Sequence, residues 1–187
     1  MYVVAEMLFP HFDFTMNAVV RRAGLRKKCL KLGPLKDPVR IYEKVSLSVT
    51  MRPSVSFCQT LHPFLARTAQ AMDDYTSRFG DGVPPEACIT DMLRCLALCS
   101  NGPGMLALLL LLSRDGGFRV TTSNGVKVHL VLIETKNKFS PKKLSPTHFR
   151  NALLKLLLRA NGTSMFVELQ VHHVDIKQTV LACICGC

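Results

Sequence analysis

Residues 151–173 read NALLKLLLRANGTSMFVELQVHH, and this stretch decides the fold. An Asn-Gly pair at 161–162, a strong turn signal, separates two apolar runs, and residues 165–171 alternate between apolar and polar side chains. The leucine-rich run before the turn suits a helix or a strand, but its place beside the turn favours a strand. The sequence therefore predicts a β-hairpin whose second strand carries Glu168 and Gln170 on one face.

The rest of the chain supplies helices and more strands around this hairpin. In chain order, the further elements predicted are helices within residues 1–44, a buried strand over 88–99, a helix over 104–114, and strands over 118–122 and 126–135. Helices that pack on paired strands of this kind make an α+β fold. We expect a mixed β-sheet of about five strands with flanking helices.

The chain length of 187 residues fits a single domain with four segments. Residues 1–44 carry the N-terminal helices and a basic helix that faces phosphate. Residues 45–70 are an atypical insertion, residues 71–178 form the sheet core of the same domain, and residues 179–187 are a Cys-rich tail.

The insertion is inferred from a change in composition. Residues 45–70 contain no Asp or Glu and show no sustained period. Their removal would join residues 43–44 to 71–75 in one amphipathic helix. A retained insertion explains this pattern, and we expect the segment to pack poorly against the sheet; a functional loop is the alternative.

The charge balance favours a polyanionic partner. Lys and Arg number 24 against 13 Asp and Glu, a net charge of +11, which attracts nucleic acid or nucleotide phosphates and also serves solubility. The longest charge-free apolar run, 105–112, is far shorter than the roughly 20 residues of a membrane helix, and no secretory signal is evident. We expect an intracellular, cytoplasmic protein without membrane contact. Its eight cysteines are then thiols, and the tail spacing does not match a zinc site.

Two groups of residues suit phosphate chemistry. Lys36, Arg40 and Lys44 recur every four residues near a helix start, a row that can grip a triphosphate, although a solvated helix face has the same pattern. Asp91 and Glu168 are carboxylates within apolar strands, where two neighbouring strands can hold Mg²⁺; a solvated sheet face is the alternative.

An aromatic residue beside a cation forms a third candidate group. Phe149 could stack on a base while Arg150 reaches phosphate, although Phe149 also suits a simple core position.

The order of these groups resembles the synthetase domain of the RelA/SpoT family. The matching motifs are Gly33-Pro34-Leu35-Lys36 with residues 40–44, Asp91 at a buried strand, Phe149-Arg150-Asn151, and Glu168-Leu169-Gln170. The resemblance implies a nucleotidyltransferase-like fold and pyrophosphate transfer from ATP to the 3′-hydroxyl of GDP or GTP, the chemistry of guanosine tetraphosphate metabolism.

The resemblance also implies a role for each residue. Asp91 and Glu168 would be catalytic and hold Mg²⁺. The nucleotide-binding residues would be Lys36, Arg40, Lys44, Phe149, Arg150 and Gln170.

The chain departs from the family pattern at four substituted positions and in the spacing of the Asp91 motif, where Arg94 lies closer to Asp91 than in the family. Pro34 stands where the family has an Arg that grips ATP, and Phe149 replaces a Tyr. Leu153 and His172 replace a His and an Arg. These changes affect nucleotide binding more than they affect the fold. Two alternatives therefore stay open: a non-catalytic RNA- or nucleotide-binding module, and a degenerate inactive homologue.

Overall fold

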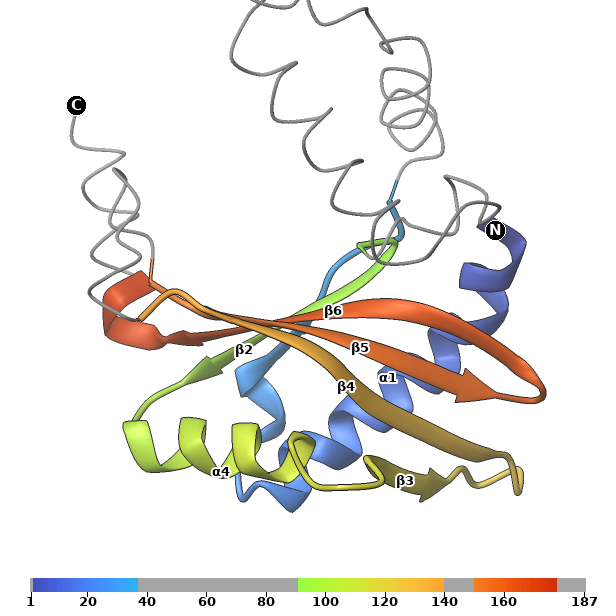
Figure 1. The fold of residues 1–187 in the computed structure, drawn as a ribbon, viewed down its shortest axis with the longest axis horizontal. Helices are drawn as coiled ribbons and strands as arrows, with labels where there is room; N and C mark the ends of the chain where they lie inside the picture. Colours follow the sequence, from blue (N-terminus) through green and yellow to red (C-terminus); the bar gives the residue numbers. More distant parts are fainter. Residues whose placement is uncertain (1, 37–90, 140–149, 178–187) are drawn as a thin grey trace, which may run out of the picture. The chain divides into compact units, whose positions relative to one another are not determined.

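Six strands form one mixed sheet in a computed structural model that describes residues 2–36, 91–139 and 150–177 (Figure 1). The elements are α1 (Tyr2–Arg22), the 3-10 turn η1 (Lys27–Cys29), β1 (Leu30–Leu32), β2 (Leu93–Cys99), α4 (Gly102–Leu112), β3 (Phe118–Thr121), β4 (Lys127–Asn137), β5 (Ala152–Ala160) and β6 (Thr163–His173). The strand order across the sheet is β1-β2-β6-β5-β4-β3. β2 and β6 run parallel, while every other neighbouring pair is antiparallel.

The predicted α+β class and mixed sheet are confirmed, with one strand more than the five expected. The additional strand is β1, which pairs antiparallel with β2 through Leu30 and Ala97. Three residues are too few to show a strand period, so β1 exists because β2 offers an edge to pair with. The predicted strand over 88–99 is shorter in the structure, where β2 begins at Leu93.

The predicted hairpin of β5 and β6 is also confirmed. Asn161 and Gly162 have φ angles of 50° and 72°, and Ala160 pairs with Thr163 across the turn. Positive φ at both central residues is the geometry of a type I′ turn, whose twist matches that of the flanking strands. The turn therefore fixes the register that places Glu168 opposite Lys155.

Helix α1 presents an apolar stripe to the sheet and ends in a glycine cap. Its buried residues recur at helical spacing: Ala5, Leu8, Phe12, Thr15, Met16, Val19 and Val20. After the helix, Gly24 adopts a φ of 75°, and the amides of Gly24 and Leu25 donate to the carbonyls of Arg21 and Val20 at 3.0 Å each. This Schellman arrangement satisfies carbonyls at the helix end without help from side chains.

Helix α4 begins at a side-chain cap. The Oδ1 atom of Asn101 accepts a hydrogen bond from the Gly104 amide at 2.8 Å, and Pro103 occupies the first turn. The helix therefore starts two residues before the predicted 104, and it buries Leu108, Leu111 and Leu112.

Both helices lie on the same face of the sheet (Figure 1). That face is apolar and buried, as the alternation along β5 shows: Leu154, Leu156 and Leu158 are fully buried, and the residues between them are partly exposed. Burying one face of each strand against helices is what makes the leucine-rich run a strand. The three described cysteines are free thiols, of which Cys95 and Cys99 face this core.

Several expectations fall outside the described residues. They are the insertion at 45–70, the tail at 179–187, and the candidate site residues Arg40, Lys44 and Phe149. Among the helices that the structure describes, none has the length and apolar character needed to cross a bilayer.

Candidate functional site

The sheet face opposite the two helices carries a polar row along β6. Glu168 and Gln170 alternate with the fully buried Val167 and Leu169, so they point away from the core, as the sequence predicts. The Nε2 atom of Gln170 donates a hydrogen bond to Oε1 of Glu168 at 2.7 Å. No hydrogen bond to the other oxygen, Oε2, is recorded among the described residues, so that oxygen can accept a ligand.

Two cations are in register with Glu168 on the neighbouring strands. Arg94 on β2 and Lys155 on β5 are its directly paired residues, and paired side chains share a face. Glu168 is therefore flanked on both sides by cationic residues at the same level of the sheet. Cationic residues on both neighbouring strands favour the binding of a ligand phosphate.

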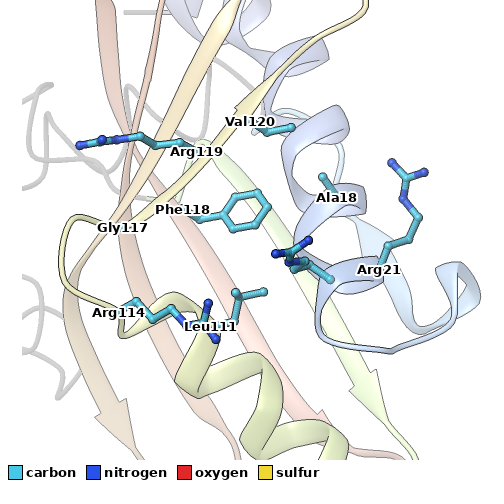
Figure 2. Close-up of a pocket in the computed structure, with 9 residues that line it drawn as sticks. Ala18, Arg21, Leu111, Arg114, Gly117, Phe118, Arg119 and Val120 are labelled. Carbon is cyan, nitrogen blue, oxygen red and sulfur yellow. The ribbon is translucent and has the colours of Figure 1, made fainter.

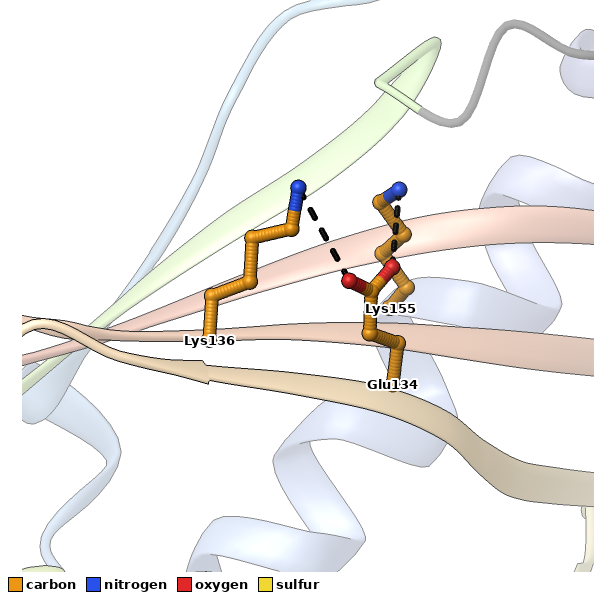
Figure 3. Close-up of polar contacts among 3 residues, drawn as sticks. All are labelled: Glu134, Lys136 and Lys155. Carbon is orange, nitrogen blue, oxygen red and sulfur yellow. Dashed lines mark ion pairs between the residues drawn. The ribbon is translucent and has the colours of Figure 1, made fainter. Parts of the chain in front are cut away.

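Lys155 is held in place by an ion pair from the next strand. Its Nζ lies 3.0 Å from Oε2 of Glu134 on β4, and Nζ of Lys136 lies 3.7 Å from the other oxygen of the same carboxylate (Figure 3). The Lys155 side chain is only 14% exposed. Because it is so little exposed, this pair restrains the ammonium more than a surface ion pair would.

A pocket of about 260 Å³ lies beside the polar row. Its lining residues come from β1, β2 and β6: Lys31, Leu32, Gly33, Arg94, Cys95, Leu96 and Gln170. The amide of Gly33 donates to the Arg94 carbonyl at 2.8 Å, and a Cβ on Gly33 would lie 2.8 Å from Cγ of Arg94. A side chain at position 33 would therefore force the Arg94 side chain to shift. Two cationic side chains, Lys31 and Arg94, and the side-chain amide of Gln170 therefore line the same pocket.

A buried polar pair ends the row. His172 and Asn151 are 2% and 1% exposed, and Nδ2 of Asn151 lies 3.3 Å from Nε2 of His172. The same imidazole nitrogen lies 3.5 Å from Oε1 of Gln170, so Glu168, Gln170, His172 and Asn151 form a continuous chain of polar contacts. Burial lowers the pKa of His172 to about 4, with further contributions from the charges of Lys177 and Lys138. The imidazole is therefore neutral at neutral pH.

The structure brings some of the predicted site residues together and separates others. Glu168 and Gln170 are joined by a hydrogen bond. Asp91 lies two residues before β2 and three before Arg94, the residue paired with Glu168. At a rise of roughly 3.3 Å per residue, an extended chain would put the Cα atom of Asp91 about 10 Å along the strand direction from that of Arg94. Within the described ranges, no group of three or more His, Cys, Asp or Glu side chains gathers at a metal-binding distance.

Arg150 has a partner that the sequence does not reveal. Its Nη1 donates to the carbonyl of Phe139 at 2.9 Å, and the Lys138 amide donates to the Asn151 carbonyl at the same distance. One guanidinium donor therefore ties the start of β5 to the end of β4. Lys36, the remaining predicted cation, is the last described residue of its segment.

Sequence reasoning missed Arg94, Lys155 and Lys31 as members of the site. Arg94 and Lys155 join Glu168 only through the pairing of β2 and β5 with β6, which no local pattern encodes. The alternation of Lys155 with buried leucines was the one available signal.

The solved structures similar to the chain include two of small alarmone synthetase 1 from Bacillus subtilis. One, bound to its product pppGpp, aligns at 11% identity with a TM-score of 0.38 and covers 62% of this chain and 56% of that chain. The other aligns at 11% identity with a TM-score of 0.49 and covers 94% of this chain and 75% of that chain. No protein-family model matches the chain, and no curated protein does either. With these TM-scores, any function has to be argued from the site residues themselves.

Proposed function

We propose that the polar face of the sheet binds a purine nucleotide together with Mg²⁺, and that the chain acts as a RelA/SpoT-like pyrophosphotransferase. The observation that carries this proposal is the position of Glu168, hydrogen-bonded to Gln170 and paired in register with Arg94 and Lys155. A carboxylate in register with two cationic residues, beside a basic pocket, combines a group that accepts a proton or binds a metal with groups that neutralise phosphate.

The cations of the face would bind the phosphates. Arg94 and Lys31 line the pocket of about 260 Å³, and guanidinium groups bind phosphate oxygens through paired hydrogen bonds. By the motif resemblance, Lys36, Arg40 and Lys44 would add positive charge for the donor triphosphate. Phe149 would stack on the acceptor base, with Arg150 beside it contributing its remaining guanidinium donors.

Glu168 and Asp91 would hold the Mg²⁺ ion. The Oε2 atom of Glu168 fits this role because it is a carboxylate oxygen with no hydrogen bond recorded among the described residues, and Mg²⁺ favours such ligands. When bound, the ion would neutralise charge on the transferred phosphates. Gln170 would fix the orientation of the carboxylate through its hydrogen bond to Oε1.

In the transfer, the 3′-hydroxyl oxygen of GDP or GTP would bond to the β-phosphorus of ATP. The bond between that phosphorus and the oxygen bridging to the α-phosphate would break, and AMP would leave. Glu168 would accept the hydroxyl proton, and the neighbouring cations would stabilise the charge on the phosphate oxygens.

A non-catalytic nucleotide-binding or RNA-binding module is the second candidate. Two residues favour this module: the neutral His172 and Pro34. Both stand where the RelA/SpoT motifs have arginines. Fewer phosphate-binding cations lower the stabilisation of a transition state more than they lower binding, since transfer depends on close electrostatic contact.

The two candidates separate when binding and turnover are measured on the same preparations. We expect the full chain to bind GDP in the presence of Mg²⁺ and to form a pyrophosphorylated product from labelled ATP. Glu168→Gln should abolish turnover and weaken Mg²⁺-dependent binding about tenfold or more, because it removes one ligand and the proton acceptor. Glu6→Gln, an equal charge change on an exposed position of α1, is the matched control. Binding without turnover would support the module, and equal behaviour of both variants would contradict the site.

A further inference from the structure

A second pocket, larger than the first, lies on the helix side of the sheet. It has a volume of about 650 Å³ and is formed by the end of α1, the end of α4 and the start of β3 (Figure 2). Glu168 points from the opposite face, so the two pockets are separated by the sheet itself. The volume lies within the range of small-molecule sites.

Three arginines with accessible side chains border this pocket. Arg21 and Arg22 end α1, and Arg114 follows α4; all three are exposed. Arg119 also borders the pocket, but its side chain points away from the Phe118 ring (Figure 2). No acidic residue lines the pocket, and none of the three arginines has a recorded ion pair within residues 2–36, 91–139 and 150–177.

The end of helix α1 does not need these cations to satisfy its carbonyl groups. Arginines near a helix C-terminus commonly complement the helix dipole. Here the carbonyls of Val20 and Arg21 already accept hydrogen bonds from the amides of Leu25 and Gly24. Local capping therefore leaves the guanidinium donors of Arg21 and Arg22 available to a ligand.

The floor and one wall of the pocket are apolar and fixed. Leu111 is buried, and the Phe118 ring projects between α1 and α4 (Figure 2). Gly117 has a φ of 68°, and a Cβ there would collide with the Leu130 carbonyl oxygen, so the chain must pass this point as glycine. The ring of His129 contacts the Gly116 carbonyl at 2.6 Å and holds the same loop. These residues give the pocket a fixed apolar wall beside the three arginines.

We propose that this pocket binds the phosphoryl groups of a small polyphosphate anion, either free or as part of a nucleotide. Arg22 at the end of α1 and Arg114 in the loop after α4 both line the pocket, and guanidinium groups bind phosphate oxygens in paired, directional hydrogen bonds. The proposal does not rest on the function assigned to the opposite face.

The test measures tripolyphosphate binding to the full chain with Mg²⁺ removed by EDTA. We expect Arg114→Glu to weaken binding about tenfold or more, as expected for loss of a charge-assisted contact. Arg159→Glu makes the same charge change at an exposed position of β5 outside the pocket and should weaken binding less than threefold. ATP should bind like tripolyphosphate if the phosphates are recognised, and adenosine should not bind.

A second variant distinguishes tripolyphosphate binding in the pocket from non-specific attraction by the positive charge of the surface. Ala18→Leu places extra volume into the pocket from α1 without changing charge, and it should also weaken tripolyphosphate binding about tenfold. Circular dichroism confirms the fold of each variant, and Arg22→Gln replaces Arg114→Glu if the latter does not fold. Equal losses from Arg114→Glu and Arg159→Glu, or full binding by Ala18→Leu, would overturn the proposal. Binding of single-stranded RNA that tripolyphosphate does not displace would overturn it too, since the surface would then recognise a strand.

Discussion

His172 is a buried imidazole that continues the polar row of the proposed site. It contacts Gln170 and Asn151, and the Oδ1 atom of Asn151 is a buried acceptor with no hydrogen-bond partner among the described residues. A buried acceptor of this kind is costly unless it is paired. If the Asn151 amide were turned over, Oδ1 would face Nε2 of His172 and accept a hydrogen bond from it.

The burial of His172 predicts a pH dependence of stability. Its pKa is lowered to about 4 in the folded chain, against 6.5 for the ordinary side chain. Between these values the unfolded chain binds a proton that the folded chain does not, so stability rises with pH. We expect the free energy of unfolding to fall by about 3 kcal/mol as pH is lowered from 7 to 4 through this residue.

Thermal unfolding at a series of pH values measures this effect. His172→Gln keeps a polar group beside Asn151 and should flatten the pH profile between 4 and 6.5. His173→Gln, the adjacent position on β6, is the control and should retain the profile of the unaltered chain. A profile unchanged by His172→Gln would show that the imidazole is not the responsible group.

At the scale of the strand, the two faces of β5 predict opposite mutational costs. Leu154 is fully buried against the helices, whereas Leu153 is partly exposed on the polar face. We expect Leu154→Ala to cost about 2–5 kcal/mol of stability and Leu153→Ala less than about 1 kcal/mol, since only the former leaves a core cavity. Denaturant unfolding of the two variants measures the difference. Similar costs would mean that β5 buries both faces.

The strands also show which elements can be predicted from local sequence patterns and which cannot. The Asn-Gly turn predicted the β5–β6 hairpin because it requires positive φ at two successive residues, a local property. The hairpin of β3 and β4 was found in the same way, from the turn residues at 123–125. β1 was missed because its three residues acquire strand geometry only by pairing with β2, a partner more than 60 positions away.

At the scale of the whole molecule, the sheet separates two basic pockets. The placement of Glu168 and Gln170 on one face could be predicted from alternation along β6. The cations beside them could not, because Arg94 and Lys155 reach Glu168 through pairings across the sheet. The pocket bordered by Arg22 and Arg114 was likewise invisible to the sequence, since it forms where two helix ends meet.

This separation predicts that the two pockets act independently. Glu168→Gln should leave tripolyphosphate affinity in EDTA within about twofold of the unaltered chain, and the double variant with Arg114→Glu should show the product of the two single effects. Isothermal titration of the four proteins measures both quantities. A departure from the product greater than about threefold would instead indicate coupling through the sheet.

The parallel pairing of β2 with β6 has a consequence for how the chain folds. Leu93 pairs with Val167, and Cys99 pairs with His173, so this parallel contact joins residues 74 positions apart. Contacts of such long range form slowly, because the entropy of closing a large loop is lost before the contacts contribute any stabilising energy. The β5–β6 hairpin can form first from local contacts. β2, with its apolar face uncovered, must then wait for β6, which leaves the ribosome long after it. During synthesis β2 is therefore the segment most exposed to non-native contacts with other chains. A chaperone would matter most in the interval before β6 is available to pair with it.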